Sequence, residues 1–258
     1  MGMLKELYSY RQMIFSLVKR DLRGRYKGSV FGFLWTFLNP LLQLVVYTFV
    51  FSFLLKSDVE NYYLFLFVAL IPWLFFSTAI TGGSGCVLHQ AGMVTKIYFP
   101  REVLPISHVT SAFINMLYSF IVVFLVLILS RVPVNLVALL YLPIIMIVEY
   151  FLALGITMIA SAITVYFRDM EFILGIFMMA WQYLTPVMYS VDIVPERLRG
   201  LFMLNPMTPI TIAYRDILYY AKAPDLSTLL IAAGMGIAFM FVGFWAFGKL
   251  KKRFAEEM

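Results

Sequence analysis

The distribution of charge near the N-terminus constrains this chain more than any other feature. Five cations fall within nine residues, at Lys19, Arg20, Arg23, Arg25 and Lys27. No charged residue follows until Lys56, so residues 29–55 exceed the roughly 20 apolar residues that cross a bilayer core, although we expect Pro40 to break the helix. Because cations gather on the cytoplasmic side of membrane proteins, the sequence predicts a first span that begins inside the cell.

Composition extends this conclusion to the whole chain. Of its 258 residues, 62% are hydrophobic and 13% are charged, and the mean hydropathy is +0.89. Soluble domains carry roughly a quarter of charged residues. We therefore predict an all-α polytopic membrane protein with no nucleic-acid partner, since its net charge of +6 reflects where the cations sit around the spans.

Several short motifs carry a resemblance to a known family. They are RDL at 20–22, RYKGS at 25–29, GFLW at 32–35, LNPL at 38–41, VYTFVF at 46–51, a run ending FPRE at 99–102, and VYFRDME at 165–171. In this order the set resembles the membrane subunits of ABC-2 type polysaccharide exporters, the family that includes permeases for O-antigen, capsule and wall teichoic acid. The resemblance covers nearly the whole chain.

Hydropathy predicts a single membrane domain over residues 1–258. Residues 4–18 show helical spacing with one polar face, which predicts a helix in the inner membrane interface within a cytoplasmic segment 1–28. Six spans are predicted within residues 29–248, and a cytoplasmic tail follows at 249–258. The predicted spans are 29–55, 63–80, 108–130, 136–166, 172–188 and 226–247.

The connections predict the topology. Most of the 20 Lys and Arg residues fall on the side of the N-terminus, so we expect both termini in the cytoplasm and no cleavable signal peptide. The long outer connection 189–225 is apolar but interrupted by prolines, which predicts short re-entrant helices between the fifth and sixth spans. Its cations would suit a phosphate-rich polymer, or they are ordinary surface charges: Arg197, Arg199, Arg215 and Lys222.

The cytoplasmic connection 82–107 is too long for a turn. We expect Pro100 and Pro105 to enclose a short amphipathic segment that docks on a soluble partner. The resemblance implies that this partner is the ATPase subunit. The residues it assigns to coupling are Lys96, Tyr98, Phe99, Pro100, Arg101 and Glu102, with Arg168 and Asp169 in the turn between the fourth and fifth spans.

The chain offers little chemistry of its own. Residues 243–249 match the G-x-x-x-x-G-K spacing of a phosphate loop, but Leu250 replaces the Ser or Thr and no strand precedes them. We interpret them as a helix end, so ATP and Mg are expected in a separate ATPase chain and no cofactor in this one. Cys86, His89 and His108 form no metal-ligand pattern, and no catalytic residue is predicted.

Two kinds of residue within the spans are candidates for a transport role. Glu149 is the acid lying well inside a predicted span, which marks either a functional site or a packing position. Aromatic rings crowd the first two spans, where they either line a sugar pathway or form core and interfacial belts. The better pathway candidates are Phe31, Trp35, Tyr47, Phe49 and Tyr62.

The resemblance implies a homodimer of this chain with two copies of an ATPase, in the bacterial cytoplasmic membrane. Its cargo would be a polyprenyl-pyrophosphate-linked polysaccharide, whose pyrophosphate Arg20, Arg23, Arg25 and Lys27 would receive. Two alternatives stay open: an ABC-2 exporter of drugs or small lipids, and a membrane enzyme acting on lipid-linked sugars.

Overall fold

The computed structural model describes residues 3–25, 27–54 and 59–257, and these ranges are helical without strands. Leu55, the predicted end of the first span, and Lys56 lie outside them. The elements are α1 Met3–Ser9, α2 Arg11–Gly24, η1 Gly32–Leu34, α3 Trp35–Thr48, η2 Phe49–Leu54, α4 Tyr62–Ser84, η3 Leu88–Gln90, α5 Ala91–Val94, α6 Val103–Leu129, α7 Leu136–Leu139, α8 Leu142–Tyr166, α9 Met170–Leu184, η4 Val191–Ile193, α10 Glu196–Met203, α11 Met207–Leu218, α12 Leu226–Leu250, η5 Lys251–Arg253 and α13 Phe254–Glu257.

The predicted all-α membrane architecture is confirmed, and five stretches are long and apolar enough to cross a membrane. They are Gly32–Leu54, Tyr62–Ser84, Val103–Leu129, Leu136–Tyr166 and Leu226–Arg253. The predicted fifth span corresponds to α9, which has 15 residues and is shorter than the roughly 17 that a helix needs to span a bilayer core. The count of six spans therefore stays a prediction.

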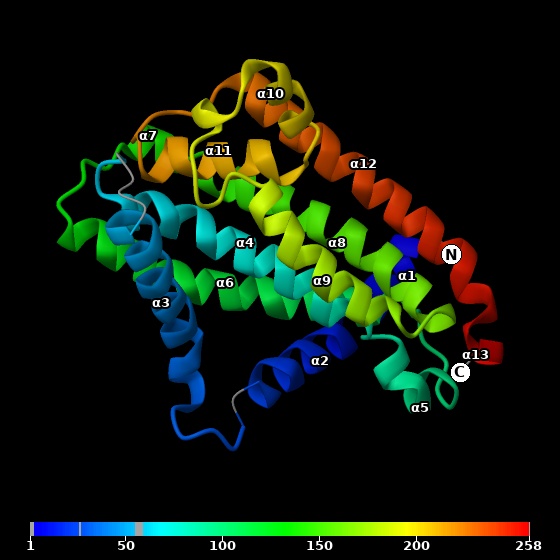
Figure 1. The fold of residues 1–258 in the computed structure, drawn as a ribbon. Helices are drawn as coiled ribbons and strands as arrows, with labels where there is room; N and C mark the ends of the chain where they lie inside the picture. The colour runs from blue at the N-terminus through cyan, green and yellow to red at the C-terminus, as the bar shows by residue number, and fades with distance from the viewer. Residues whose placement is uncertain (1–2, 26, 55–58, 258) are drawn as a thin grey trace.

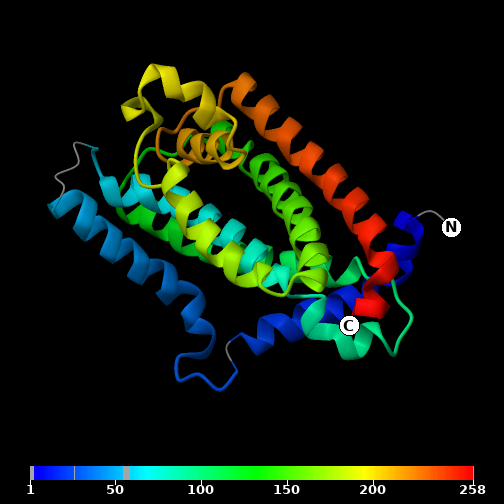
Figure 2. The same cartoon turned by 45° about the vertical axis from the view of Figure 1, so that its right-hand side comes forward.

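Helix α4 forms the centre of the bundle. It contacts α6, α8, α3, α9 and α11, and 78% of its apolar window is buried. Apolar residues surround its whole circumference, which is the pattern of a helix packed on all sides. Helix α3 lies at the edge of the bundle, as Figures 1 and 2 show, and only 11% of the first stretch is buried.

Helices α8 and α12 pack at backbone distance. A Cβ added at Gly155 would lie 2.3 Å from the carbonyl oxygen of Phe239, and one added at Gly243 would lie 2.3 Å from that of Gly155. Only glycine permits this approach, which is how small residues bring membrane helices together. Gly243 thus contributes to helix packing, and the whole 243–249 segment is α-helical, as predicted.

The predicted break at Pro40 is wrong, because α3 continues through it. A proline removes the N–H that would bond the carbonyl four residues earlier, here that of Thr36. Ser119 Oγ of α6 donates to the Thr36 carbonyl oxygen at 3.3 Å. A hydroxyl from a neighbouring helix thereby replaces the missing donor, as occurs in membrane helices.

The bundle has two distinct ends (Figure 1). Helices α1, α2, α5 and α13 gather at one end, here called the α2 end, whereas α7, α10 and α11 gather at the other, the α11 end. The connection from α2 to α3 turns at Gly28 and Gly32, which have φ values of +83° and +49° that favour glycine. Nothing lies within 4 Å of a Cβ added at either glycine, so this single chain leaves both open.

Candidate functional site

Helix α2, η1 and α6 line an apolar groove with a basic edge. Its volume is about 760 Å³, and it is lined by Phe15, Val18, Lys19, Leu22, Arg23, Lys27, Gly32, Phe33 and Tyr118. The three cations follow one another at four-residue intervals, and all are exposed. Residues four apart share one face of a helix, which explains the continuous basic edge over the first two.

The structure separates the four cations predicted to receive pyrophosphate. Arg23 and Lys27 line the apolar groove together with Lys19, which the sequence analysis did not select. Arg25 instead pairs with Asp21, with 3.4 Å between Nη2 and Oδ2. Arg20 lines a small polar pocket near His89 and His108. Only two of the four therefore share a site.

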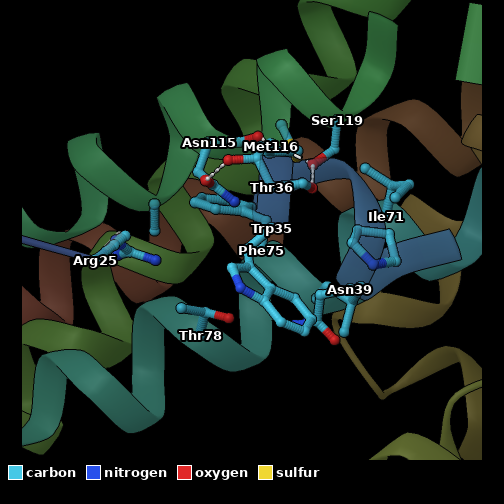
Figure 3. A pocket seen from close by; sticks show the side chains of 13 residues that line it. Arg25, Trp35, Thr36, Asn39, Ile71, Phe75, Thr78, Asn115, Met116 and Ser119 are labelled. Carbon is cyan, nitrogen blue, oxygen red and sulfur yellow. Dashed lines mark hydrogen bonds between the residues drawn. The ribbon is translucent and has the colours of Figure 1, made fainter. Parts of the chain in front are cut away.

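Arg25 lines a second, more polar pocket between α3, α4 and α6, here called the α3–α4–α6 pocket (Figure 3). Its volume is about 390 Å³, and its lining is Arg25, Trp35, Thr36, Asn39, Pro40, Ile71, Leu74, Phe75, Thr78, Ala112, Asn115, Met116 and Ser119. Thr36 Oγ1 donates to Asn115 Oδ1 at 3.4 Å, and Ser119 also bonds the Asn115 carbonyl oxygen at 3.1 Å. Hydrogen bonds thus tie α3 to α6 along one wall of the pocket.

The predicted pathway aromatics divide by exposure. Phe31, Trp35 and Phe49 are 51%, 37% and 56% exposed, and the first two make an edge-to-face contact at 5.6 Å. Tyr47 is half-buried. Tyr62 is 3% exposed, and its hydroxyl donates to the carbonyl oxygen of Met188 at 2.7 Å. Tyr62 therefore lies in the core, apart from the other four.

The predicted coupling segment is a loop at the α2 end. Lys96 and Tyr98 are exposed, the latter by 86%, whereas Phe99 and Pro100 are buried beneath them. The prediction that Pro105 ends this segment is wrong: α6 begins at Val103, so Pro105 lies in its first turn, where a proline is tolerated because the first N–H groups have no helical partner.

Two coupling residues bind the C-terminal segment instead of solvent. Glu102 is 1% exposed and accepts a hydrogen bond from Lys251 Nζ at 2.5 Å. Arg101 Nη1 donates to the Lys251 carbonyl oxygen at 2.6 Å, and Tyr166 donates to that of Leu250 at 2.8 Å. These contacts, here called the C-terminal clasp, join the coupling loop to the end of α12. Lys251 is not among the residues predicted from the sequence, because it lies about 150 positions from Arg101 and Glu102.

The second predicted coupling turn lies close to the first. Arg168 and Asp169 are exposed between α8 and α9. Nearby, His89 Nε2 lies 3.3 Å from Glu171 Oε1, which connects η3 to the first turn of α9. The two connections therefore form one surface at the α2 end.

At the α11 end, Arg215 contradicts its predicted role as an external cation. It is 3% exposed, and its guanidinium donates to the carbonyl oxygens of Val187 at 2.6 Å, Tyr189 at 2.9 Å and Phe65 at 3.4 Å. The group also lies 3.6 Å from the centre of the Phe65 ring. The sequence predicts Arg215 as an external cation within the re-entrant segment, but α11 is folded into the bundle. Its arginine supplies donors to the non-helical backbone of Val187 and Tyr189 and a further donor to Phe65 of α4.

The neighbouring polar groups of α11 are also internal. Asp216 pairs with Lys222 at 3.1 Å, and burial raises the pKa of this carboxyl group while the lysine opposes the rise. Tyr214 donates to Glu149 Oε2 at 2.7 Å, and both residues are fully buried. Glu149 therefore joins α8 to α11.

These features define the chain as a helical membrane protein with exposed basic and loop surfaces at the α2 end and a buried polar cluster at the α11 end. The sequence profile of the ABC-2 type transporter family matches residues 12–219, and the chain belongs to this family. It is 34% identical to an O-antigen export system permease protein of Myxococcus xanthus over 99% of both chains. It is 32% identical to a protein of the same description from Klebsiella pneumoniae, over 93% of this chain and 92% of the relative.

Proposed function

We propose that the chain is the membrane subunit of an ATP-driven exporter that moves polyprenyl-pyrophosphate-linked polysaccharide across the bacterial cytoplasmic membrane. The observation that carries the proposal is similarity along nearly the entire chain to two permeases described as O-antigen export proteins. ATP and Mg are bound by a separate ATPase, of which two copies act with two copies of this chain.

The α2 end faces the cytoplasm in this proposal. Both terminal helices, α1 and α13, lie at that end together with α5. Two termini on the same side of the membrane require an even number of crossings. Five stretches are long enough to span, so α9 supplies the sixth crossing with residues 185–188, which continue beyond it. Helices α10 and α11 then occupy the outer side as re-entrant elements.

The coupling surface comprises the exposed residues of the two neighbouring connections: Lys96, Tyr98, Arg168 and Asp169. Ile97, which is 58% exposed, adds an apolar side chain to them. An exposed aromatic and an aliphatic side chain surrounded by charges suit a groove on a soluble partner. Buried Phe99, Pro100 and Glu102 position this loop, and Arg101 connects it to the clasp.

The second copy is expected at the exposed faces of α3 and α9. Val45 and Val46 on α3 are 64% and 58% exposed, Phe49 at the start of η2 is 56% exposed, and α9 exposes Ile173 and Ile176 by 57% and 68%. Such faces meet either lipid or protein. A pathway between two copies would place the exposed aromatics Phe31, Trp35 and Phe49 with half-buried Tyr47 along it, whereas buried Tyr62 would support it from behind.

The apolar groove with its basic edge suits the lipid carrier. A polyprenyl chain requires an apolar surface, and Lys and Arg attract anionic head groups by about 1 kcal/mol each near a membrane surface. We assign the pyrophosphate to Lys19, Arg23 and Lys27, whereas Arg20 and Arg25 lie in other pockets.

Depletion of the chain in its host tests the proposal. A lipid-linked glycan should accumulate inside the cell, and its phosphate content distinguishes a sugar polymer such as O-antigen or capsule from a teichoic acid. Absence of accumulation, together with growth loss only under drug challenge, would instead indicate an exporter of drugs or small lipids. Conversion of a lipid-linked sugar by the purified chain alone would indicate an enzyme.

A further inference from the structure

We propose that the α3–α4–α6 pocket binds the first sugar units next to the pyrophosphate and thereby selects which lipid-linked glycans are exported. This inference rests on the proposed function and adds a specificity site to it. It concerns a pocket within one chain, formed by α3, α4 and α6, and does not depend on a second copy.

The lining has the chemistry of a saccharide site. Trp35 and Phe75 provide rings whose faces pack against the C–H surface of a sugar. Asn39, Asn115 and Thr78 provide amide and hydroxyl groups, which both donate and accept, as sugar hydroxyls do. The volume of about 390 Å³ lies within the roughly 300–1,000 Å³ of small-molecule sites.

Some of these polar groups have no structural task in the bundle. Thr36, Asn115 and Ser119 make the hydrogen bonds that join α3 to α6. Asn39 is exposed and accepts a hydrogen bond only from Gln43 on its own helix, at 3.1 Å, among the bonds found in the described residues. Polar side chains are costly at membrane depth, so groups beyond those needed for packing indicate a ligand.

Arg25 provides a cation at the same pocket. Its Nε is buried and makes no hydrogen bond within the described residues, although Nη2 pairs with Asp21. Figure 3 shows Arg25 at one side of the pocket, whose lining also includes Trp35 and Thr78. A free N–H of arginine suits a phosphate oxygen or a sugar hydroxyl.

The pocket and the apolar groove meet where η1 passes into α3. Gly32 and Phe33 of η1 line the groove, whereas Trp35 and Thr36 of α3 line the pocket. The rise of a 3-10 helix is about 2 Å per residue and that of an α-helix about 1.5 Å, so the two linings lie only a few ångströms apart along the chain. A carrier whose pyrophosphate lies at the basic edge therefore brings its first sugars to the pocket, so recognition concerns the sugar at the lipid-linked end and not the repeating unit.

The test compares two carriers on the exporter reconstituted with its ATPase. Undecaprenyl pyrophosphate and the same lipid bearing one N-acetylhexosamine are titrated, and the concentration giving half-maximal ATPase stimulation is recorded. We expect the sugar to lower this concentration about 10-fold, the scale of one or two hydrogen bonds. Asn39→Leu and Thr78→Val should reduce that ratio to about 1, while Trp245→Leu, on exposed α12 surface, preserves it.

The outcomes separate the two proposals. An unchanged sugar ratio in both variants would overturn the saccharide pocket and leave the exporter intact. No stimulation by either carrier in the wild type would contradict the proposed function itself. Should Asn39→Leu not assemble, Trp35→Phe tests the same pocket with a smaller ring and should lower the ratio by a factor of about 3.

Discussion

The two ends of the bundle use charge in opposite ways. At the α2 end, Lys19, Arg23 and Lys27 are exposed along a groove that no carboxylate of the described residues lines. At the α11 end, Arg215 is 3% exposed, and its guanidinium binds three backbone carbonyl oxygens. Cations at the first end are available to a partner, whereas the cation at the second end is used up by backbone acceptors, two of which lie outside the helices.

The physical reason is the cost of burial. A buried polar group left without a partner costs about 1–3 kcal/mol, and more when it is charged. The exposed cations contribute little to folding, so substitution there should alter binding. Substitution at Arg215 should alter folding. The largest effect is therefore expected at Arg215, and smaller effects are expected at the exposed cations.

Arg215→Met should abolish folding of the α11 end. The carbonyl oxygens of Val187 and Tyr189, which lie outside the helices, lose their donor at once, a cost of roughly 2–6 kcal/mol. Recovery of monodisperse protein from membranes in detergent measures the effect. Exposed Arg197→Met is the matched control and should be recovered normally. Equal recovery of both variants would remove the contrast between the two ends.

Neutralising the basic edge should weaken carrier binding without affecting folding. Lys19→Gln, Arg23→Gln and Lys27→Gln together remove about 3 kcal/mol of attraction, which raises the half-maximal concentration of polyprenyl pyrophosphate about 100-fold. ATPase stimulation in proteoliposomes measures this concentration. Arg20→Gln, which lies at another pocket, should change it less than 3-fold. A larger effect of Arg20 than of the triple variant would relocate the site.

Lys251→Met should uncouple ATP hydrolysis from transport. It leaves Glu102 buried without its partner, so one of the two side-chain contacts that connect the coupling loop to Lys251 is lost, and only that of Arg101 remains. We expect transport per ATP hydrolysed to fall about 5-fold, as a loss near 1 kcal/mol implies. Exposed Lys252→Met is the control.

A second substitution distinguishes the clasp from a general loss of stability. Glu102→Gln removes the buried charge that Lys251→Met leaves unpaired, so the double variant should recover part of the assembly lost by the single one. Its coupling ratio should stay low, because the ionic contact is still absent. Full recovery of coupling in the double variant would exclude a transmitting role for the clasp.

The smallest effect concerns the pair of buried Asp216 and exposed Lys222. Lys222→Met should lower the free energy of unfolding by about 1 kcal/mol, because solvent screens the lysine end of the contact. Burial raises the pKa of Asp216 above its ordinary value of 3.8, so the folded chain binds more protons. The contribution of Asp216 to the free energy of unfolding therefore falls as the pH rises from 3.8 through the raised pKa. Thermal unfolding from pH 4 upward should show this slope in the wild type and not in Asp216→Asn.

The sequence predicted the helical architecture well because hydropathy determines where a chain can cross a bilayer. It predicted a helix over residues 4–18, which the structure divides into α1 and α2, and it located the five stretches long enough to span. It misjudged Pro40 because the compensating donor, Ser119, is on another helix. The proline at position 40 predicts a helix break from the local sequence, whereas the hydroxyl of Ser119, which compensates for it, lies 83 positions from Thr36, whose carbonyl it bonds.

The candidate sites were predicted less completely, because they depend on pairs far apart in the sequence. Glu102 and Lys251 form one contact although 149 positions separate them, and Thr36 meets Asn115 across 79 positions. Arg215 is predicted from the sequence as an external cation, and only the packing of α11 in the bundle shows that it is buried. Charge counting separates inside from outside, but it does not separate a cation that binds a partner from one that binds backbone.

The most direct test of the whole account is transport in proteoliposomes that contain this chain and its ATPase, with a polyprenyl-pyrophosphate oligosaccharide supplied on the side of the α2 end. The account predicts ATP-dependent appearance of the oligosaccharide on the opposite side, and its loss when Lys19, Arg23 and Lys27 are neutralised. Transport that proceeds without ATP, or that is unaffected by the triple substitution, would contradict it.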